Sequence, residues 1–154
     1  MKQLEFFIPG EPKAKQRPQF SSLTKKGFTP PQTLNYESYA KMYIYSKWDA
    51  GEIIKWGEHE PLFMFSTSFH SLPKSKLKKW EASMGLFYPT TKPDFDNVVK
   101  IIADTMNKLV FPDDAQIVGA LPFKKYAPPG ELPGVRVKIL SVYNIPNELL
   151  SLVL

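Results

Sequence analysis

Residues 92–118 read KPDFDNVVKIIADTMNKLVFPDDAQIV, and this stretch decides how the chain can fold and what it can do. From Phe95 to Val110, apolar residues recur at three- and four-residue steps, which predicts a helix with one broad apolar face. Four carboxylates flank this predicted helix: Asp94, Asp96, Asp113 and Asp114. The sequence therefore concentrates negative charge at both ends of one short amphipathic helix.

The first two carboxylates can face a single cation. Asp94 and Asp96 are two residues apart, and side chains at that spacing in extended backbone point the same way. A helix of about 14 residues is roughly 21 Å long, so its two ends cannot share an ion by themselves. Either the helix is shorter than it reads, or the loop at Phe111 and Pro112 folds back and carries Asp114 toward the first pair. We expect the loop to fold back.

The chemistry of these ligands points to a hard divalent cation. Oxygen ligands without His or Cys favour Mg²⁺ or Mn²⁺ over zinc, and such an ion can polarise a scissile phosphate. Lys100 lies four residues after Asp96 on the same helical face, where it could neutralise charge on that phosphate. A structural interpretation stays open, because Asp commonly caps helices and forms turns, and Lys100 can pair with Asp104.

Composition sets the broader limits. The chain has 154 residues, of which 43% are hydrophobic, and we expect one domain over residues 1–154. The absence of cysteine excludes disulfides, thiolate zinc sites and cysteine nucleophiles. No apolar run approaches the ~20 residues that cross a bilayer, and the first residues lack a signal-peptide pattern, so we expect a cytoplasmic protein without a membrane partner. The eight glycines show no phosphate-cradling pattern, so no nucleotide cofactor is expected.

The distribution of charge favours a polyanionic partner. The formal net charge is +5, and basic residues crowd the segments that precede the carboxylates. The basic residues that we expect to contact DNA are Lys13, Lys15, Arg17, Lys74, Lys76 and Lys92. Neither of the two histidines, His59 and His70, has a partner at metal-ligand spacing, so we interpret both as surface or core residues.

The remaining pattern predicts an α+β domain with a mixed sheet, in the order β-α-β-α-β-β. Strands are expected over residues 3–8, 61–71, 116–126 and 134–143, and the main helices over residues 35–55 and 95–110. Shorter helices are expected over residues 75–83 and 147–154. Residues 10–33 read as an extended basic loop or a hairpin with Gly27 near its turn.

The compound motif resembles the RusA family of Holliday-junction resolvases. That family's pattern is Lys-Pro-Asp-hydrophobic-Asp-Asn-x-x-Lys, a helix with an internal Asp, and then Asp-Asp-Ser/Ala-Gln before a strand, which residues 92–118 match. Residues 7–18 are similar to the family's opening strand and basic, proline-rich turn. Gln16 and Gln19 depart from the family, since basic residues are usual at these places.

The resemblance implies a homodimeric, Mg²⁺-dependent endonuclease, with Mn²⁺ as a substitute, that nicks four-way DNA junctions symmetrically in recombination and repair. Many members of the family are encoded by phages and prophages. The family's essential positions, three acidic metal ligands and one lysine, fall on Asp94, Asp96, Asp114 and Lys100. Asp104 and Asp113 match further acidic positions. Two alternatives stay open: a non-catalytic protein of the same family that binds branched DNA, and a structural protein whose aspartates only cap helices and form turns.

Overall fold

A computed structural model of the chain describes residues 2–49, 51 and 55–145. The elements are, in chain order, β1 (Gln3–Pro9), β2 (Gln19–Phe20), β3 (Gly27–Phe28), α1 (Pro31–Asp49), β4 (Leu62–His70), α2 (Lys76–Ser83), α3 (Phe95–Met106), β5 (Ile117–Tyr126) and β6 (Gly134–Ser141). One-turn 3-10 helices follow α3 and β6, at Asp114–Gln116 and Val142–Asn144. The helix expected at residues 147–154 lies outside the described residues.

Four strands form one mixed sheet in the order β1-β6-β4-β5. Strand β6 pairs antiparallel with both β1 and β4, whereas β4 and β5 are parallel. A parallel pair needs a long crossover, and the segment between β4 and β5 supplies it with α2 and α3. The α+β class and the mixed sheet expected from the sequence are therefore confirmed, while the homodimer stays a prediction.

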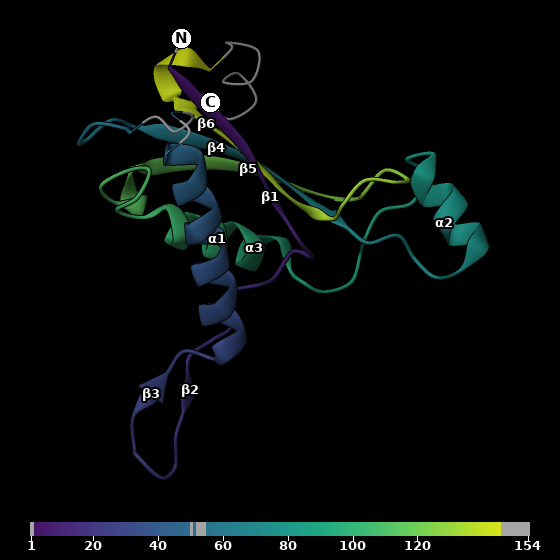
Figure 1. Cartoon of the computed structure of the whole chain (residues 1–154), viewed down its shortest axis with the longest axis horizontal. Helices are drawn as coiled ribbons and strands as arrows, with labels where there is room; N and C mark the ends of the chain where they lie inside the picture. The colour runs from purple at the N-terminus through teal and green to yellow at the C-terminus, as the bar shows by residue number, and fades with distance from the viewer. Residues whose placement is uncertain (1, 50, 52–54, 146–154) are drawn as a thin grey trace.

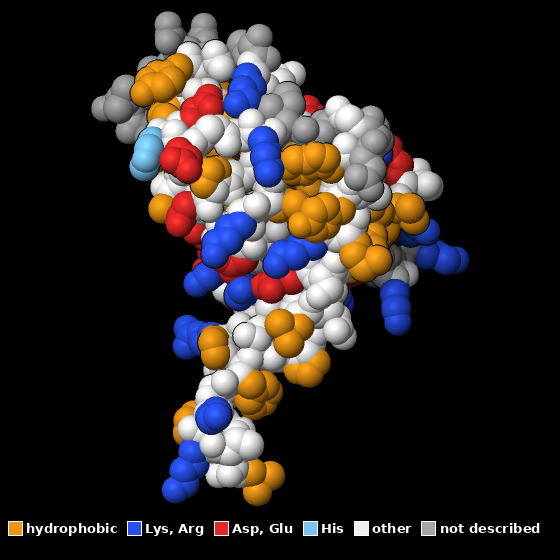
Figure 2. Space-filling model, turned by 60° about the vertical axis from the view of Figure 1, so that its left-hand side comes forward, with side chains coloured by type: hydrophobic (Ala, Val, Ile, Leu, Met, Phe, Trp, Pro, Cys, Tyr) orange, Lys and Arg blue, Asp and Glu red, His pale blue; other side chains and the backbone are white. Residues whose placement is uncertain are grey.

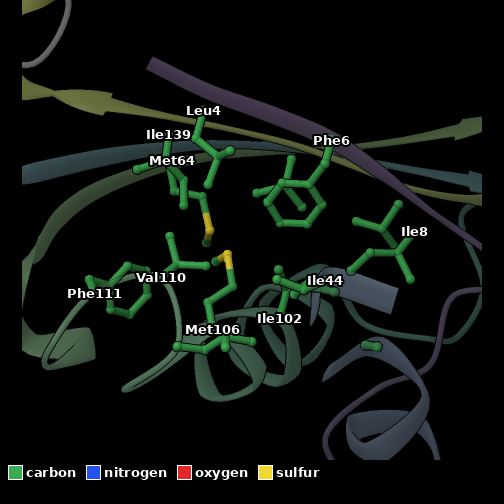
Figure 3. Packing of buried hydrophobic residues seen from close by; sticks show 14 of the residues in the cluster. Leu4, Phe6, Ile8, Ile44, Met64, Ile102, Met106, Val110, Phe111 and Ile139 are labelled. Atoms are coloured by element: carbon green, nitrogen blue, oxygen red, sulfur yellow. The ribbon is translucent and has the colours of Figure 1, made fainter. Parts of the chain in front are cut away.

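The core lies between the sheet and the two helices on one of its faces. Figure 1 shows α1 and α3 beneath the same face of the sheet, and Figure 3 shows apolar side chains of strands and helices meeting there. The buried apolar residues of α3 are Val98, Ile101, Ile102 and Met106, at the spacing of one helical face. Alternate residues of β4, beginning with Leu62 and Met64, are also buried, and they form the sheet's side of this core. Each fully buried aliphatic side chain contributes about 1.5–3 kcal/mol.

Helix α3 is shorter than the sequence predicted, because it ends at Met106 rather than at Val110. The next residue, Asn107, leaves the helical region with ψ 131°, and Lys108 adopts φ +63°. The N–H of Lys108 then donates to the carbonyl of Phe111 at 2.8 Å. This tight turn buries Val110 and Phe111, so apolar residues that read as more helix pack into the core from a loop.

Helix α1 begins earlier than predicted, at Pro31, and ends at Asp49. A proline fits the first helical position, because its missing N–H would have no partner there and its φ is already helical. Before α1, residues 10–33 include the expected hairpin, built from β2 and β3. Its turn falls at residues 22–24, and Gly27 lies in β3, shortly after the turn. Within the described residues, no helix has the length and apolar character of a membrane span.

Candidate active site

A pocket of about 710 Å³ opens at the start of α3. Its wall is formed by residues 11–19 of the N-terminal loop, by Lys92, Asp94 and Asn97, and by His70 at the end of β4. Basic residues in the wall outnumber acidic ones: Lys13, Lys15, Arg17 and Lys92 against Glu11 and Asp94. A phosphate group is a suitable ligand for such a concave, mainly basic surface.

The first carboxylate pair lies at the N-terminal end of α3. Asp94 occupies the position before the first helical residue, but its side chain makes no capping hydrogen bond. Asp96 lies in the first turn, and both residues are exposed. The structural interpretation, in which an aspartate only caps the helix, therefore does not describe Asp94. A helix N-terminus also favours anions, which include a substrate phosphate.

Lys15, which we expected to contact DNA, lines the pocket and also takes part in an ion-pair network. Its Nζ is 2.7 Å from Oε1 of Glu37 on α1 and 2.7 Å from Oδ2 of Asp104 on α3. Its backbone N–H donates to the carbonyl of Asn97 at 2.9 Å. Burial alone would lower the pKa of Lys15, but the hydrogen bonds and attraction to Asp104 and Glu37 outweigh burial and raise that pKa. Lys15 therefore ties the basic loop to both helices.

This network also determines the partner of Asp104. Asp104 pairs with Lys15, from a distant part of the chain, and not with Lys100, the partner one helical turn away that the sequence allowed. Lys100 is exposed and lies one turn after Asp96. It can therefore reach a ligand that lies beside Asp96.

The second carboxylate pair separates into two different environments. Oδ1 of Asp113 accepts a hydrogen bond from the N–H of Ala115 at 2.8 Å, and Oε1 of Gln116 accepts one from the N–H of Asp113 at 3.3 Å. Asp113 is thus a helix cap, as the structural interpretation anticipated. Asp114 lies at the far end of α3, where its Oδ1 is 3.5 Å from Nδ2 of Asn107.

The two ends of α3 do not converge within one chain. The helix has 12 residues and is roughly 18 Å long, and the loop at Phe111 turns into the core rather than back along the helix. In the described ranges, which contain every aspartate of the motif, no group of three or more His, Asp or Glu side chains could hold a metal ion. The convergence expected for Asp114 is therefore not met in a single chain. Asp94 and Asp96 alone, as exposed oxygen ligands, fit a hard cation.

Two pocket residues had no predicted role in the site. His70 is 6% exposed, with Nε2 3.2 Å from Oγ of Ser68 and Nδ1 3.6 Å from Oε1 of Glu11. Burial lowers the pKa of His70, and Glu11 opposes this shift in part, so the ring is neutral near pH 7. Glu11 also accepts a hydrogen bond from Oγ of Ser71 at 2.6 Å, which fixes the start of the basic loop at the end of β4.

The sequence contains a signal that His70 points inward. His70 continues the alternation of β4, in which Ser66 and Ser68 are also buried. His59, by contrast, is exposed in a turn with φ +62°, in keeping with its predicted surface role.

The other predicted DNA contacts fall into two groups. Lys13, Arg17 and Lys92 line the pocket, and Arg17 and Lys92 are exposed. Lys74 and Lys76 are exposed just before and at the start of α2. Figure 1 shows α2 beyond the end of the sheet, apart from α1 and α3. A DNA molecule would have to extend past the pocket to reach both groups.

Comparison with known proteins identifies the family. The model of the endodeoxyribonuclease RusA family matches residues 9–140, from the end of β1 through nearly all of β6. The chain belongs to the RusA endodeoxyribonuclease family. This RusA-family chain is also 35% identical over 145 residues to the protein YqaN of Bacillus subtilis (strain 168), which is described as uncharacterized. The alignment covers 90% of the chain and 96% of that relative. The resemblance inferred from residues 92–118 is thereby confirmed.

Proposed function

We propose that this RusA-family protein is a Mg²⁺-dependent endodeoxyribonuclease that resolves four-way DNA junctions by paired, symmetric nicks. The observation that carries the proposal is the exposed pair Asp94 and Asp96, beside a basic pocket whose wall includes Asp94. Because Asp94 does not cap α3, its carboxylate can serve a ligand. Membership of a family of endodeoxyribonucleases supports the reaction class.

Asp94 and Asp96 would hold the cation, since Mg²⁺ is commonly bound by one or two carboxylates together with waters and substrate phosphate. When bound, Mg²⁺ or Mn²⁺ polarises the scissile phosphate and lowers the pKa of a bound water. Lys100 stabilises the charge that develops on the phosphate during attack. Lys13, Arg17 and Lys92 bind the flanking phosphates and so orient the scissile bond over the pair, and Lys74 and Lys76 extend these contacts.

We also propose that the protein acts as a homodimer, in which two sites related by a two-fold axis match the symmetry of a four-way junction. Asp114 can then act with Asp94 and Asp96 only from the second copy, because α3 separates them in one chain. Asp104 and Asp113 support the site without binding the ion, since they pair with Lys15 and cap the turn at Ala115.

Cleavage of a labelled four-way junction, compared with a linear duplex of the same sequence, tests this function. In Mg²⁺ or Mn²⁺ we expect paired nicks near the branch point of the junction and no cutting of the duplex. EDTA should stop the reaction, because the carboxylates alone cannot activate water. Cutting that survives EDTA would reject the metal-dependent mechanism, and equal cutting of both DNAs would reject selectivity for junctions.

The alternative of a non-catalytic protein that binds branched DNA rests on one observation. Within one chain, the described residues form no cluster of three carboxylates. Under this alternative the protein would bind the junction in Mg²⁺ but leave it intact at every protein concentration, so the same assay separates the two functions. Binding should weaken as salt rises in both cases.

A further inference from the structure

The β2–β3 hairpin is the centre of an arm, residues 17–29, that stands away from the rest of the molecule. Figure 1 shows it projecting beyond the start of α1, and Figure 2 shows apolar and basic side chains along it to its tip. At the base, the N–H of Gln16 donates to Oγ1 of the buried Thr33 at 3.1 Å, and Nε2 of Gln16 donates to Oε1 of Gln32 at 2.9 Å. The base is therefore fixed to the body while the tip reaches into solvent.

Apolar side chains are exposed on both faces of the arm and at its tip. Phe20 is 70% exposed, Phe28 43% and Leu23 95%. The register pairs Phe20 with Gly27 and Phe28 with Gln19, so the two rings point to opposite faces of the ribbon. Gly27 has no side chain that could cover the ring of Phe20. Apolar groups gathered in this way on a projecting ribbon indicate a partner that covers them.

The charge of this region indicates what that partner is. Residues 12–36 contain five basic residues and no acidic residue. Two of the five, Lys25 and Lys26, are exposed in the arm itself. The arm also begins at Arg17, which lines the same pocket as Asp94. A polyanion complements this surface, whereas a second arm packed against it would meet it with like charge, because the arm carries basic and no acidic residues.

We propose that the arm is a wedge that enters the branch point of a four-way DNA junction. Phe20 and Phe28 stack on the end bases of two separated DNA helices, and Leu23, at the tip of the arm, enters the branch point first. Two helices meet end to end at a branch point, so inserting a side chain there separates helix ends and costs less than insertion within a continuous linear duplex. Aromatic rings stack on any base, which suits recognition of structure rather than sequence. This proposal rests on the proposed function, and it identifies the branch point as the part of the substrate that the arm recognises.

The test uses a junction that carries 2-aminopurine at the branch point, in EDTA so that no strand is cut. Unaltered protein should raise the fluorescence by unstacking this base. The triple variant Phe20→Ser, Leu23→Ser and Phe28→Ser should bind without the rise, and its preference for the junction over the duplex should fall by about tenfold or more. The matched control, Lys25→Gln with Lys26→Gln, should keep the rise and lose affinity for both DNAs alike.

If the triple variant raised the 2-aminopurine fluorescence as much as the unaltered protein does, the wedge proposal would be overturned. A lower oligomeric state of that variant in light scattering would also overturn it, because a second copy would then be the occupant. Leu23→Ser alone provides a second test if the triple variant does not fold, since this side chain is almost fully exposed. Cleavage without arm-dependent opening would reject only the wedge, whereas opening without cleavage would reject only the proposed catalysis.

Discussion

Asp96→Asn should lower the rate of junction cleavage in Mg²⁺ by about three orders of magnitude or more. Loss of a metal ligand removes several kcal/mol of transition-state stabilisation, and each 1.36 kcal/mol corresponds to a factor of ten in rate. Asp96 is exposed in the first turn of α3, so the amide replaces the carboxylate without opening a cavity. Junction affinity, carried by Lys13, Arg17 and Lys92, should persist, and the two effects are measured by gel cleavage and by fluorescence anisotropy in EDTA.

Asp113→Asn is the matched control for the loss of a carboxylate in the same motif. Asp113 caps a turn, so we expect cleavage to continue at nearly the unaltered rate, with stability lowered by at most about 1 kcal/mol. Normal cutting by Asp96→Asn would remove Asp96 from the mechanism. Equal loss of cutting in both variants would mean that the motif acts through its overall charge or its fold rather than through one ligand pair.

Lys15→Met should lower the free energy of unfolding by about 2–3 kcal/mol. The change leaves Glu37 and Asp104, whose side chains are 16% and 24% exposed, without their shared cation. Removing one partner of a fully buried pair costs about 3–5 kcal/mol, and the partial exposure of these side chains reduces that figure. For a domain of this size the melting temperature should fall by about 5–10 °C, measured by circular dichroism.

Two further variants decide whether the lost charge is the cause. Lys13→Met, in the same loop, should change the free energy of unfolding by no more than about 0.5 kcal/mol, because the described part of the chain gives Lys13 no such pair of carboxylates. Adding Asp104→Asn to Lys15→Met should recover part of the loss, because one uncompensated carboxylate is then removed. If Lys15→Met melts like Lys13→Met and only DNA binding weakens, then Lys15 is a phosphate contact as the sequence first indicated.

The elements that repeat regularly could be predicted from the sequence. The helical spacing from Val98 to Met106 placed α3 and its buried face, and the apolar run from Leu62 placed β4 at the core. The compound motif of residues 92–118 was also sufficient to indicate the family, which the match over residues 9–140 confirms. These features depend on local periodicity and fixed spacing, which a single sequence records directly.

Features that depend on long-range contacts could not be predicted. Lys15 reads as a free basic residue, and only the approach of α1 and α3 brings Glu37 and Asp104 to it. The burial of Phe111 likewise decides that the loop turns into the core, which keeps Asp114 at the far end of α3. Glu11 had no predicted role for the same reason, because its partner Ser71 at the end of β4 is 60 residues away along the chain.

The position of the catalytic ion can be mapped directly by replacing Mg²⁺ with Fe²⁺ in the complex with a four-way junction. With ascorbate and peroxide, bound iron generates hydroxyl radicals that cut the polypeptide close to the ion, and mass spectrometry locates the cuts. We predict cuts at residues 92–97, in the facing loop at residues 11–19 and, from the second copy, at residues 113–116, suppressed by excess Mg²⁺ and lost in Asp94→Asn. Cuts confined to residues 113–116, or cuts that Mg²⁺ does not suppress, would contradict a metal site at the start of α3.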